Sequence, residues 1–293
     1  MIKKKVRCVD RNSIYFPVLE IPLKLDINHP SLLEKESLLQ ELSNNLAIRE
    51  GKGYLKGKLG KVLVRVDTGE IITTVSNNYY LLTHEKFLDN VEEIMRLNGI
   101  EFELFDVNIG GKNNNRIYVN YLLPSYKFDV DGEVFIPFIQ AYNCYDKFLS
   151  YGLLTGIYRE DTESAFLVFN KSILVSRRHS REKLELTEDM VDVRGWISKL
   201  TELRRKVKDL KSKQVSEYDS FLVIGSVLKA RRHRDLFIKH KLQSREEDKF
   251  GKNYFSLLLS LMYYSTHGLY NSSRIRPYDL SRYSQIKIHE IFL

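Results

Sequence analysis

A cluster of basic residues directly follows an apolar run and could bind phosphate groups. The apolar run covers residues 165–176, and the cluster consists of Arg177, Arg178, His179 and Arg181. A guanidinium group donates two parallel hydrogen bonds to phosphate oxygens, and a preceding buried strand would hold the cluster in place. The alternative is a corner between a strand and a helix, at which the arginines pair with nearby carboxylates. The sequence leaves both interpretations open.

Further basic residues could extend such a surface. Those on predicted helices are Arg204, Arg205, Lys208, Arg231, Arg232 and Arg234. A loop of glycine and lysine over residues 51–61 adds Lys52, Lys56 and Lys58 around Tyr54, and its backbone amides could meet phosphates. It is not a nucleotide-binding P-loop, because no Gly-Lys-Ser/Thr follows at the required spacing. A mobile hairpin loop explains the same residues equally well.

Tyrosines in the first half of the chain could stack on bases while cations follow the backbone, which favours single strands. The candidates in predicted strands or loops are Tyr54, Tyr79, Tyr80, Tyr118, Tyr121 and Tyr126. The alternative is that these tyrosines are half-buried packing residues, as most tyrosines in sheets are.

The excess positive charge lies in one part of the chain. The formal net charge is +8 at pH 7. Residues 171–252 contain 22 lysines and arginines against 13 aspartates and glutamates, whereas the remainder contains 24 against 25. A localised basic field is typical of proteins that bind polyanions. The alternative is a solvated helical surface.

Patterns for catalysis or metal binding are weak. The seven histidines form no His-x-His or His-Glu-x-x-His pattern, and the two cysteines form no Cys-x-x-Cys. Asp129, Asp131 and Glu133 would place three carboxylates on one strand face, which could hold a hard cation as in a nuclease. A turn at Asp131-Gly132 explains the same residues. We therefore predict no catalytic residue, no metal ion and no cofactor.

The sequence of the first half predicts antiparallel strands together with helices. Residues 62–66 and 71–75 flank a turn and predict a hairpin, and two prolines in 14–22 favour an edge strand or a covering arm rather than a central strand. Thr83 is predicted to cap a helix that ends near Gly99, and a capping box predicts another over 31–46. Further strand candidates cover residues 101–107, 116–123, 127–138, 151–158 and 165–175.

Beyond residue 180 the apolar spacing becomes helical. A narrow seam consists of Val193, Trp196, Leu200, Leu203, Val207 and Leu210. Two more helices are predicted over 216–240 and 253–266, and alternation over 285–291 predicts a strand. We expect an α+β fold, with a largely antiparallel sheet and packed helices in residues 1–180. A basic, mainly helical region over 181–293 would pack on this first part.

Composition and segment lengths bear on the compartment. Cys8 and Cys144 are distant in sequence and suggest no disulfide framework, which fits a reducing compartment. The N-terminus starts with positive charge but lacks the apolar segment of a signal peptide. No stretch approaches the ~20 apolar residues of a membrane span. We therefore expect a cytoplasmic protein without a membrane partner.

Several short motifs, taken together, resemble a family of phage- and plasmid-encoded proteins, the domain of unknown function 932. They are Val64-Arg65-Val66-Asp67-Thr68-Gly69, Val75-Ser76 followed by Tyr79 or Tyr80, Leu123-Pro124, Asn143-Cys144-Tyr145-Asp146, Leu167-Val168-Phe169-Asn170 and Arg178-His179-Ser180. The chain departs from the family at Lys147-Phe148 and at Phe169 and Lys171, where the family favours Gly-Ser, Cys and Gly. The resemblance implies a mobile-element origin in a bacterial host cell and an α+β core, but no established activity.

These observations predict a nucleic-acid-binding protein without catalytic activity. It would favour single-stranded DNA and assist annealing in replication or recombination. One alternative is a homo-oligomeric protein-interaction module in phage defence or counter-defence, in which the seam around Leu203 contacts a second copy. Another is a metal-dependent nuclease that uses Asp129, Asp131 and Glu133.

Overall fold

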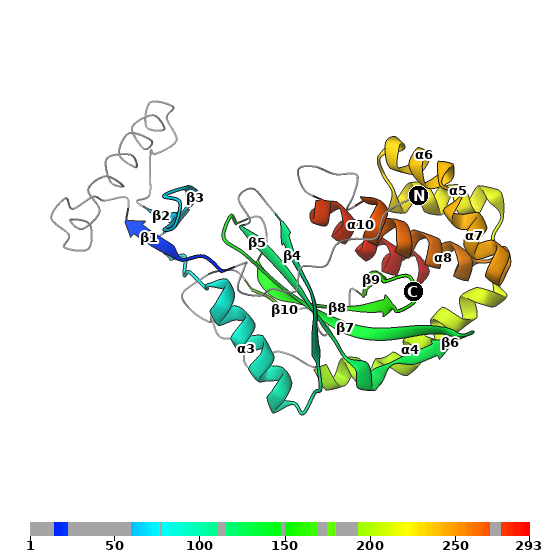
Figure 1. The fold of residues 1–293 in the computed structure, drawn as a ribbon, viewed down its shortest axis with the longest axis horizontal. Helices are drawn as coiled ribbons and strands as arrows, with labels where there is room; N and C mark the ends of the chain where they lie inside the picture. The colour runs from blue at the N-terminus through cyan, green and yellow to red at the C-terminus, as the bar shows by residue number, and fades with distance from the viewer. Residues whose placement is uncertain are drawn as a thin grey trace.

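The described residues form two antiparallel sheets followed by a group of helices (Figure 1). The computed structural model describes residues 15–22, 60–76, 78–110, 115–147, 150–168, 175–177, 179, 193–269 and 277–293. Strands prevail in the first part and helices after residue 193, so the predicted α+β fold class is confirmed. The predicted helix over 31–46, residues 51–59 of the predicted loop and the boundary at residue 180 lie outside the described residues, while residues 60 and 61 of that loop begin a strand.

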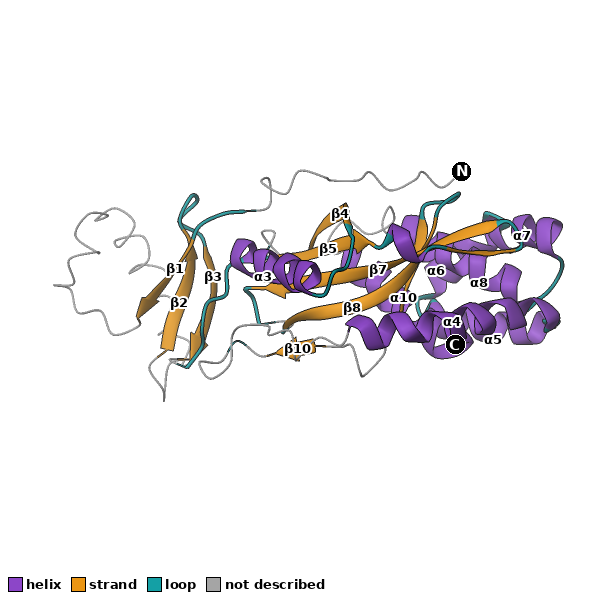
Figure 2. Ribbon diagram, turned by 90° about the horizontal axis from the view of Figure 1, so that it is seen from below, coloured by secondary structure: helices purple, strands orange, loops and turns teal. Residues whose placement is uncertain are grey.

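The smaller sheet contains β1 (Val18–Pro22), β2 (Gly60–Arg65) and β3 (Ile71–Ser76), in that order. The predicted hairpin is confirmed as β2 and β3, and β1 is an edge strand as its prolines indicated. The apolar face of this smaller sheet packs beside one end of the larger sheet (Figure 2).

The larger sheet has the strand order β10-β8-β7-β5-β4, all neighbours being antiparallel. The bounds are Glu103–Gly110 for β4, Arg116–Leu122 for β5, Glu133–Cys144 for β7, Tyr151–Arg159 for β8 and Val175–Arg177 for β10. Two short strands are added, β6 (Phe128–Val130) on β7 and β9 (Ser164–Val168) on β8. A short 3₁₀ turn, η3 (Pro124–Tyr126), precedes β6.

Two of the predicted strands are divided in the structure. The segment over 127–138 forms the β6–β7 hairpin, and its Asp131-Gly132 turn has positive φ at both residues, which suits Asp-Gly. The segment over 165–175 forms β9 and β10, which pair with successive parts of β8. Val168 lies opposite Thr155, and Val175 lies opposite Leu153. Both short strands therefore follow the same edge of the sheet.

A predicted helix covers one face of this sheet. Helix α3 (His84–Leu97) begins after Thr83, whose hydroxyl accepts a hydrogen bond from the amide of Lys86 at 3.3 Å. Its buried side, with Phe87 and Val91, packs on the sheet at β7. The predicted cap and helix are both confirmed.

The second half consists of helices. They are α4 (Val193–Ser212), α5 (Glu217–Val227), α6 (Arg231–Lys239), α7 (Leu242–Phe250), α8 (Tyr254–Tyr263), the π turn η5 (Tyr264–Gly268) and α10 (Pro277–Phe292). The single helix predicted over 216–240 is in fact two, because the chain leaves the helical conformation at Leu228. The predicted helix over 253–266 is confirmed, and α7 was not predicted.

The strand predicted over 285–291 is wrong, because these residues belong to α10. The buried positions of α10 follow helical spacing, and three of them, Ser281, Ser284 and Gln285, are polar. An apolar pattern alone therefore showed only Ile286, Ile288 and Ile291, of which the first two alternate with polar residues as in a strand. Helix α10 lies against the other face of the sheet, where Ile286 packs near β9.

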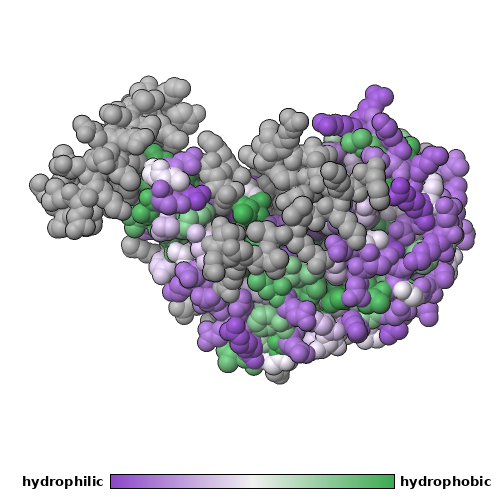
Figure 3. Space-filling model, in the orientation of Figure 1, coloured by the Kyte–Doolittle hydropathy of each residue, from purple (hydrophilic) through white to green (hydrophobic). Residues whose placement is uncertain are grey.

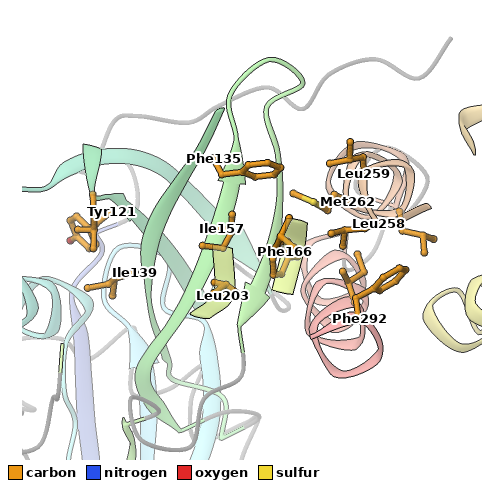
Figure 4. Close-up of a cluster of buried hydrophobic side chains, with 14 of the residues drawn as sticks. Tyr121, Phe135, Ile139, Ile157, Phe166, Leu203, Leu258, Leu259, Met262 and Phe292 are labelled. Carbon is orange, nitrogen blue, oxygen red and sulfur yellow. The ribbon is translucent and has the colours of Figure 1, made fainter. Parts of the chain in front are cut away.

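The core joins the sheet to the helices (Figure 4). Phe135, Ile157 and Phe166 from the strands point toward Met262 of α8 and Phe292 of α10. The predicted seam of α4 belongs to this core, with the buried residues Leu200, Leu203, Val207 and Leu210. This face of α4 is therefore not available to a second copy, and the predicted contact there is wrong.

An ionic network ties α7 to the sheet. Buried Arg159 of β8 contacts Glu133 at 2.6 Å, Asp161 at 2.7 Å and Glu246 of α7 at 2.9 Å. Lys249 of α7 also pairs with Glu133. The charges of this network are paired within the chain, which is the arrangement that makes buried ions tolerable.

Candidate nucleic-acid interface

The excess positive charge belongs to α4 through α7. Residues 193–252 contain 17 lysines and arginines against 8 aspartates and glutamates, whereas residues 171–192 contain five of each. The segment of the first arginine cluster therefore contributes no net charge. Arg177 ends β10, while Arg178 and Arg181 lie outside the described residues, as do Lys52, Tyr54, Lys56 and Lys58.

His179, the described side chain of that cluster, is buried. Its ring stacks on Tyr79 with 5.0 Å between centroids, and its Nδ1 lies 3.3 Å from the carbonyl oxygen of Tyr80. Burial lowers the pKa of His179 to about 4, so the imidazole is neutral at pH 7. His179 is thus a packing residue and does not face a phosphate.

A second histidine is buried close by, at the junction of the two sheets. The ring of His84 stacks on Tyr145 with 3.9 Å between centroids, and its Nδ1 lies 3.1 Å from Nδ2 of Asn143. Burial, with a smaller contribution from His179, lowers the pKa of His84 to about 3. Sequence reasoning missed this cluster, although Asn143 and Tyr145 stand in one of the motifs noted above.

The tyrosines predicted to stack on bases are mostly buried. Tyr118 and Tyr121 are fully enclosed in the sheet, Tyr79 lies under His179, and the hydroxyl of Tyr121 donates to Glu92 at 3.0 Å. Tyr126 is half-buried, and Tyr80 is exposed. The prediction of a tyrosine platform on the sheet is therefore wrong, because α3 and α10 cover its two faces.

The carboxylates predicted for a metal site do not share a strand face. Asp131 lies in the hairpin turn and pairs with Lys211 at 2.9 Å, and Glu133 faces Arg159. The side chain of Asp129 accepts from the amide of Gly132 at 3.2 Å. Within the described ranges, no three histidine, cysteine or acidic side chains gather as metal ligands would. This arrangement does not support the nuclease alternative.

The start of α6 combines an uncapped helix end with exposed arginines. The helix begins after Ala230, whose side chain cannot cap it, and its first turn contains no acidic residue. Arg231 and Arg232 are exposed there, and Arg234 donates to the carbonyl of Lys229 at 2.8 Å. The first amides of a helix already carry partial positive charge. Arginines at this position repel that charge and strengthen the local attraction for an anion.

An exposed aromatic ring lies beside this turn. Tyr283 of α10 is 38% exposed, and its ring centroid is 5.1 Å from Nζ of Lys229 and 5.9 Å from Nζ of Lys287. Ser284 donates to the carbonyl of Val227 at 3.2 Å, which holds α10 against the end of α5. The structure thus combines a ring and cations from distant parts of the sequence. Sequence reasoning missed Tyr283 and Lys287, since it placed the following residues in a strand.

A second basic surface lies on α4. Arg204, Arg205 and Lys208 are exposed on the side opposite the buried seam, and the four-residue spacing of Arg204 and Lys208 aligns them. Arg205 has a long contact of 3.8 Å with Asp209. Helices α4 and α6 lie on opposite sides of the helical group in Figure 1. The predicted basic residues therefore form two surfaces, in a part of the molecule where hydrophilic residues prevail (Figure 3).

Comparisons of the chain with models of protein families, with curated proteins and with solved structures give no match. Among the described helices, none combines the length and apolar character needed to cross a bilayer. Function is therefore inferred from the chemistry of the two basic surfaces.

Proposed function

We propose that this chain is a nucleic-acid-binding protein without catalytic activity. The observation that supports this most is the first turn of α6, which lacks a cap and an acidic residue and exposes Arg231 and Arg232. A bound phosphate would accept hydrogen bonds from the amides of Arg231 and Arg232 and from the guanidinium groups. It would also offset the repulsion between the arginines and the helix dipole.

An exposed aromatic ring between two lysines supports a preference for single strands. The exposed ring of Tyr283 between Lys229 and Lys287 could stack on an unpaired base while the cations contact the flanking phosphates. A duplex keeps its bases inside and could use only the phosphate contacts. A role in annealing during replication or recombination of a mobile element remains a proposal drawn from the resemblance.

Oligonucleotide titrations at two salt concentrations test this function. Labelled single and double strands are titrated at about 50 mM and about 200 mM salt, and affinity should fall steeply because bound phosphates release counterions. The variant Arg232→Gln/Lys287→Gln should bind both forms more weakly and with a smaller salt dependence. A second variant, Arg204→Gln/Lys208→Gln, measures how much the basic surface of α4 contributes to the affinity.

The matched control removes two exposed lysines of the sheet part, in Lys86→Gln/Lys127→Gln. This variant has the same net charge as each test variant and should keep most of the wild-type affinity. Absence of binding at the lower salt concentration would contradict the proposal. If the control and both test variants lost the same amount of affinity, binding would depend only on the net charge of the protein. The two proposed surfaces would then be wrong.

A further inference from the structure

Helix α5 exposes an apolar stripe on its outer side. The stripe consists of Tyr218, Phe221 and Leu222, which are 71%, 60% and 48% exposed. Their spacing of three and four residues places them on one face, whereas Ile224 and Val227 are buried on the other. Adjacent exposed apolar side chains on a helix are typical of an interaction surface.

The charges around this stripe have opposite signs at its two ends. Glu217 and Asp219 lie in the first turn of α5, and Lys229 and Arg231 follow its last turn. Glu217 contacts Lys252 at 3.3 Å and Arg231 contacts Asp235 at 3.8 Å, but the side chains of Glu217 and Arg231 stay 92% and 88% exposed and can reach a partner. Carboxylates on both sides of Tyr218 repel phosphate, so the apolar stripe is not itself part of the nucleic-acid surface, although Lys229 and Arg231 at its basic end belong to that surface.

We propose that a second copy of this chain packs on the stripe, with the two α5 helices antiparallel about a two-fold axis. In such a contact the same surface serves both partners. The antiparallel arrangement brings the acidic end of each helix to the basic end of the other, which is the electrostatic complementarity that fixes register. A helix of 11 residues is about 16 Å long, so Phe221 and Leu222 meet their own copies near its middle.

Light scattering over a concentration series tests the contact. The wild-type mass should rise from one chain to two as the concentration increases to about 100 µM, a range that covers micromolar dissociation constants. Phe221→Asp should keep the mass of one chain, because it places two carboxylates at the centre of the contact. The matched control is Leu97→Asp, which changes an exposed leucine of α3 and should dimerise like the wild type.

Charge reversal tests the antiparallel arrangement. Glu217→Lys alone should weaken the dimer, and combining it with the single reversal Arg231→Glu should restore part of the lost affinity. A wild-type mass of one chain at every concentration overturns the proposal, as does an unchanged dimer in folded Phe221→Asp. A Phe221→Asp variant that loses oligonucleotide binding while the wild type is monomeric would assign the stripe to nucleic acid instead.

Discussion

The role proposed for Tyr283 can be separated from that of the cations around it. Replacement by leucine removes the aromatic face and keeps an apolar side chain of similar exposure. Base stacking contributes about 1–3 kcal/mol per base, so Tyr283→Leu should lower affinity for a single strand at least several-fold. Affinity for a duplex should stay near the wild-type value. The measurement is a pair of titrations with matched single- and double-stranded oligonucleotides.

Tyr80 supplies the control for this substitution, because it has the same exposed fraction of 38% and lies between β3 and α3, outside the helical part of the chain. Tyr80→Leu should leave both affinities unchanged. Equal losses for single and double strands in Tyr283→Leu would show that the ring supports the surface and does not contact a base.

The distribution of tyrosines shows what residue-level patterns could not reveal. Alternation correctly placed Tyr118 and Tyr121 in a strand, but it could not show that helices cover both faces of the sheet. The contact between Tyr283 and Lys229 joins residues that are distant in sequence. Such a site arises only from tertiary packing, whereas the arginines of α6 were visible as a local run.

At the scale of elements, the start of α6 connects stability with function. Ala230 has extended backbone angles, φ −77° and ψ 128°, which an N-cap residue requires. Ala230→Asp should therefore cap the helix and raise the free energy of unfolding by about 1 kcal/mol. The new carboxylate would occupy the place of the proposed phosphate, so affinity for nucleic acid should fall. Urea unfolding and oligonucleotide titration measure the two effects.

The N-cap of α3 provides a comparison for Ala230→Asp, because removing it should change stability without changing nucleic-acid affinity. Thr83→Ala removes a hydroxyl that accepts from the amide of Lys86, so it should lower stability by about 1 kcal/mol. Nucleic-acid affinity should not change, because α3 lies on the sheet. If Ala230→Asp raised stability without lowering affinity, the start of α6 would not be the anion site.

Elements whose signals are local were predictable, and those defined by burial were not. The β2–β3 hairpin and α3 follow from a turn sequence and a cap that lie within a few residues. Helix α10 escaped prediction because its buried face contains Ser281, Ser284 and Gln285, which have partners in the fold that the sequence does not display. The residues between α5 and α6 include no proline or glycine, so the sequence did not indicate that the predicted helix is interrupted there.

At the scale of the molecule, the buried histidines His84 and His179 should make stability depend on pH. Burial holds the pKa of His84 at about 3 and that of His179 at about 4, while an unfolded histidine has a pKa of about 6.5. Above about pH 6.5 both states are neutral and stability is complete. As pH falls below that value, the unfolded chain takes up protons that the folded chain does not. Each imidazole then lowers the free energy of unfolding by about 1.4 kcal/mol per pH unit.

Urea unfolding between about pH 7.5 and about pH 5 measures this slope. His84→Phe keeps a ring against Tyr145 but cannot titrate, so its slope should be smaller than that of the wild type by up to about 1.4 kcal/mol per pH unit, whatever its stability at pH 7.5. An unchanged slope would mean that the acid sensitivity arises from other groups.

The network around Arg159 has a consequence for how the chain unfolds. Its members come from β7, β8, the turn after β8 and α7, and separating the helices from the sheet would break the contacts of Arg159 with Glu246 and of Glu133 with Lys249. Loss of one partner of a buried pair typically costs about 3–5 kcal/mol, and the shared apolar core opposes separation as well. The strands of the larger sheet and the helices that follow should therefore melt in one cooperative transition. A calorimetric trace would then contain a single peak for both, despite their different compositions.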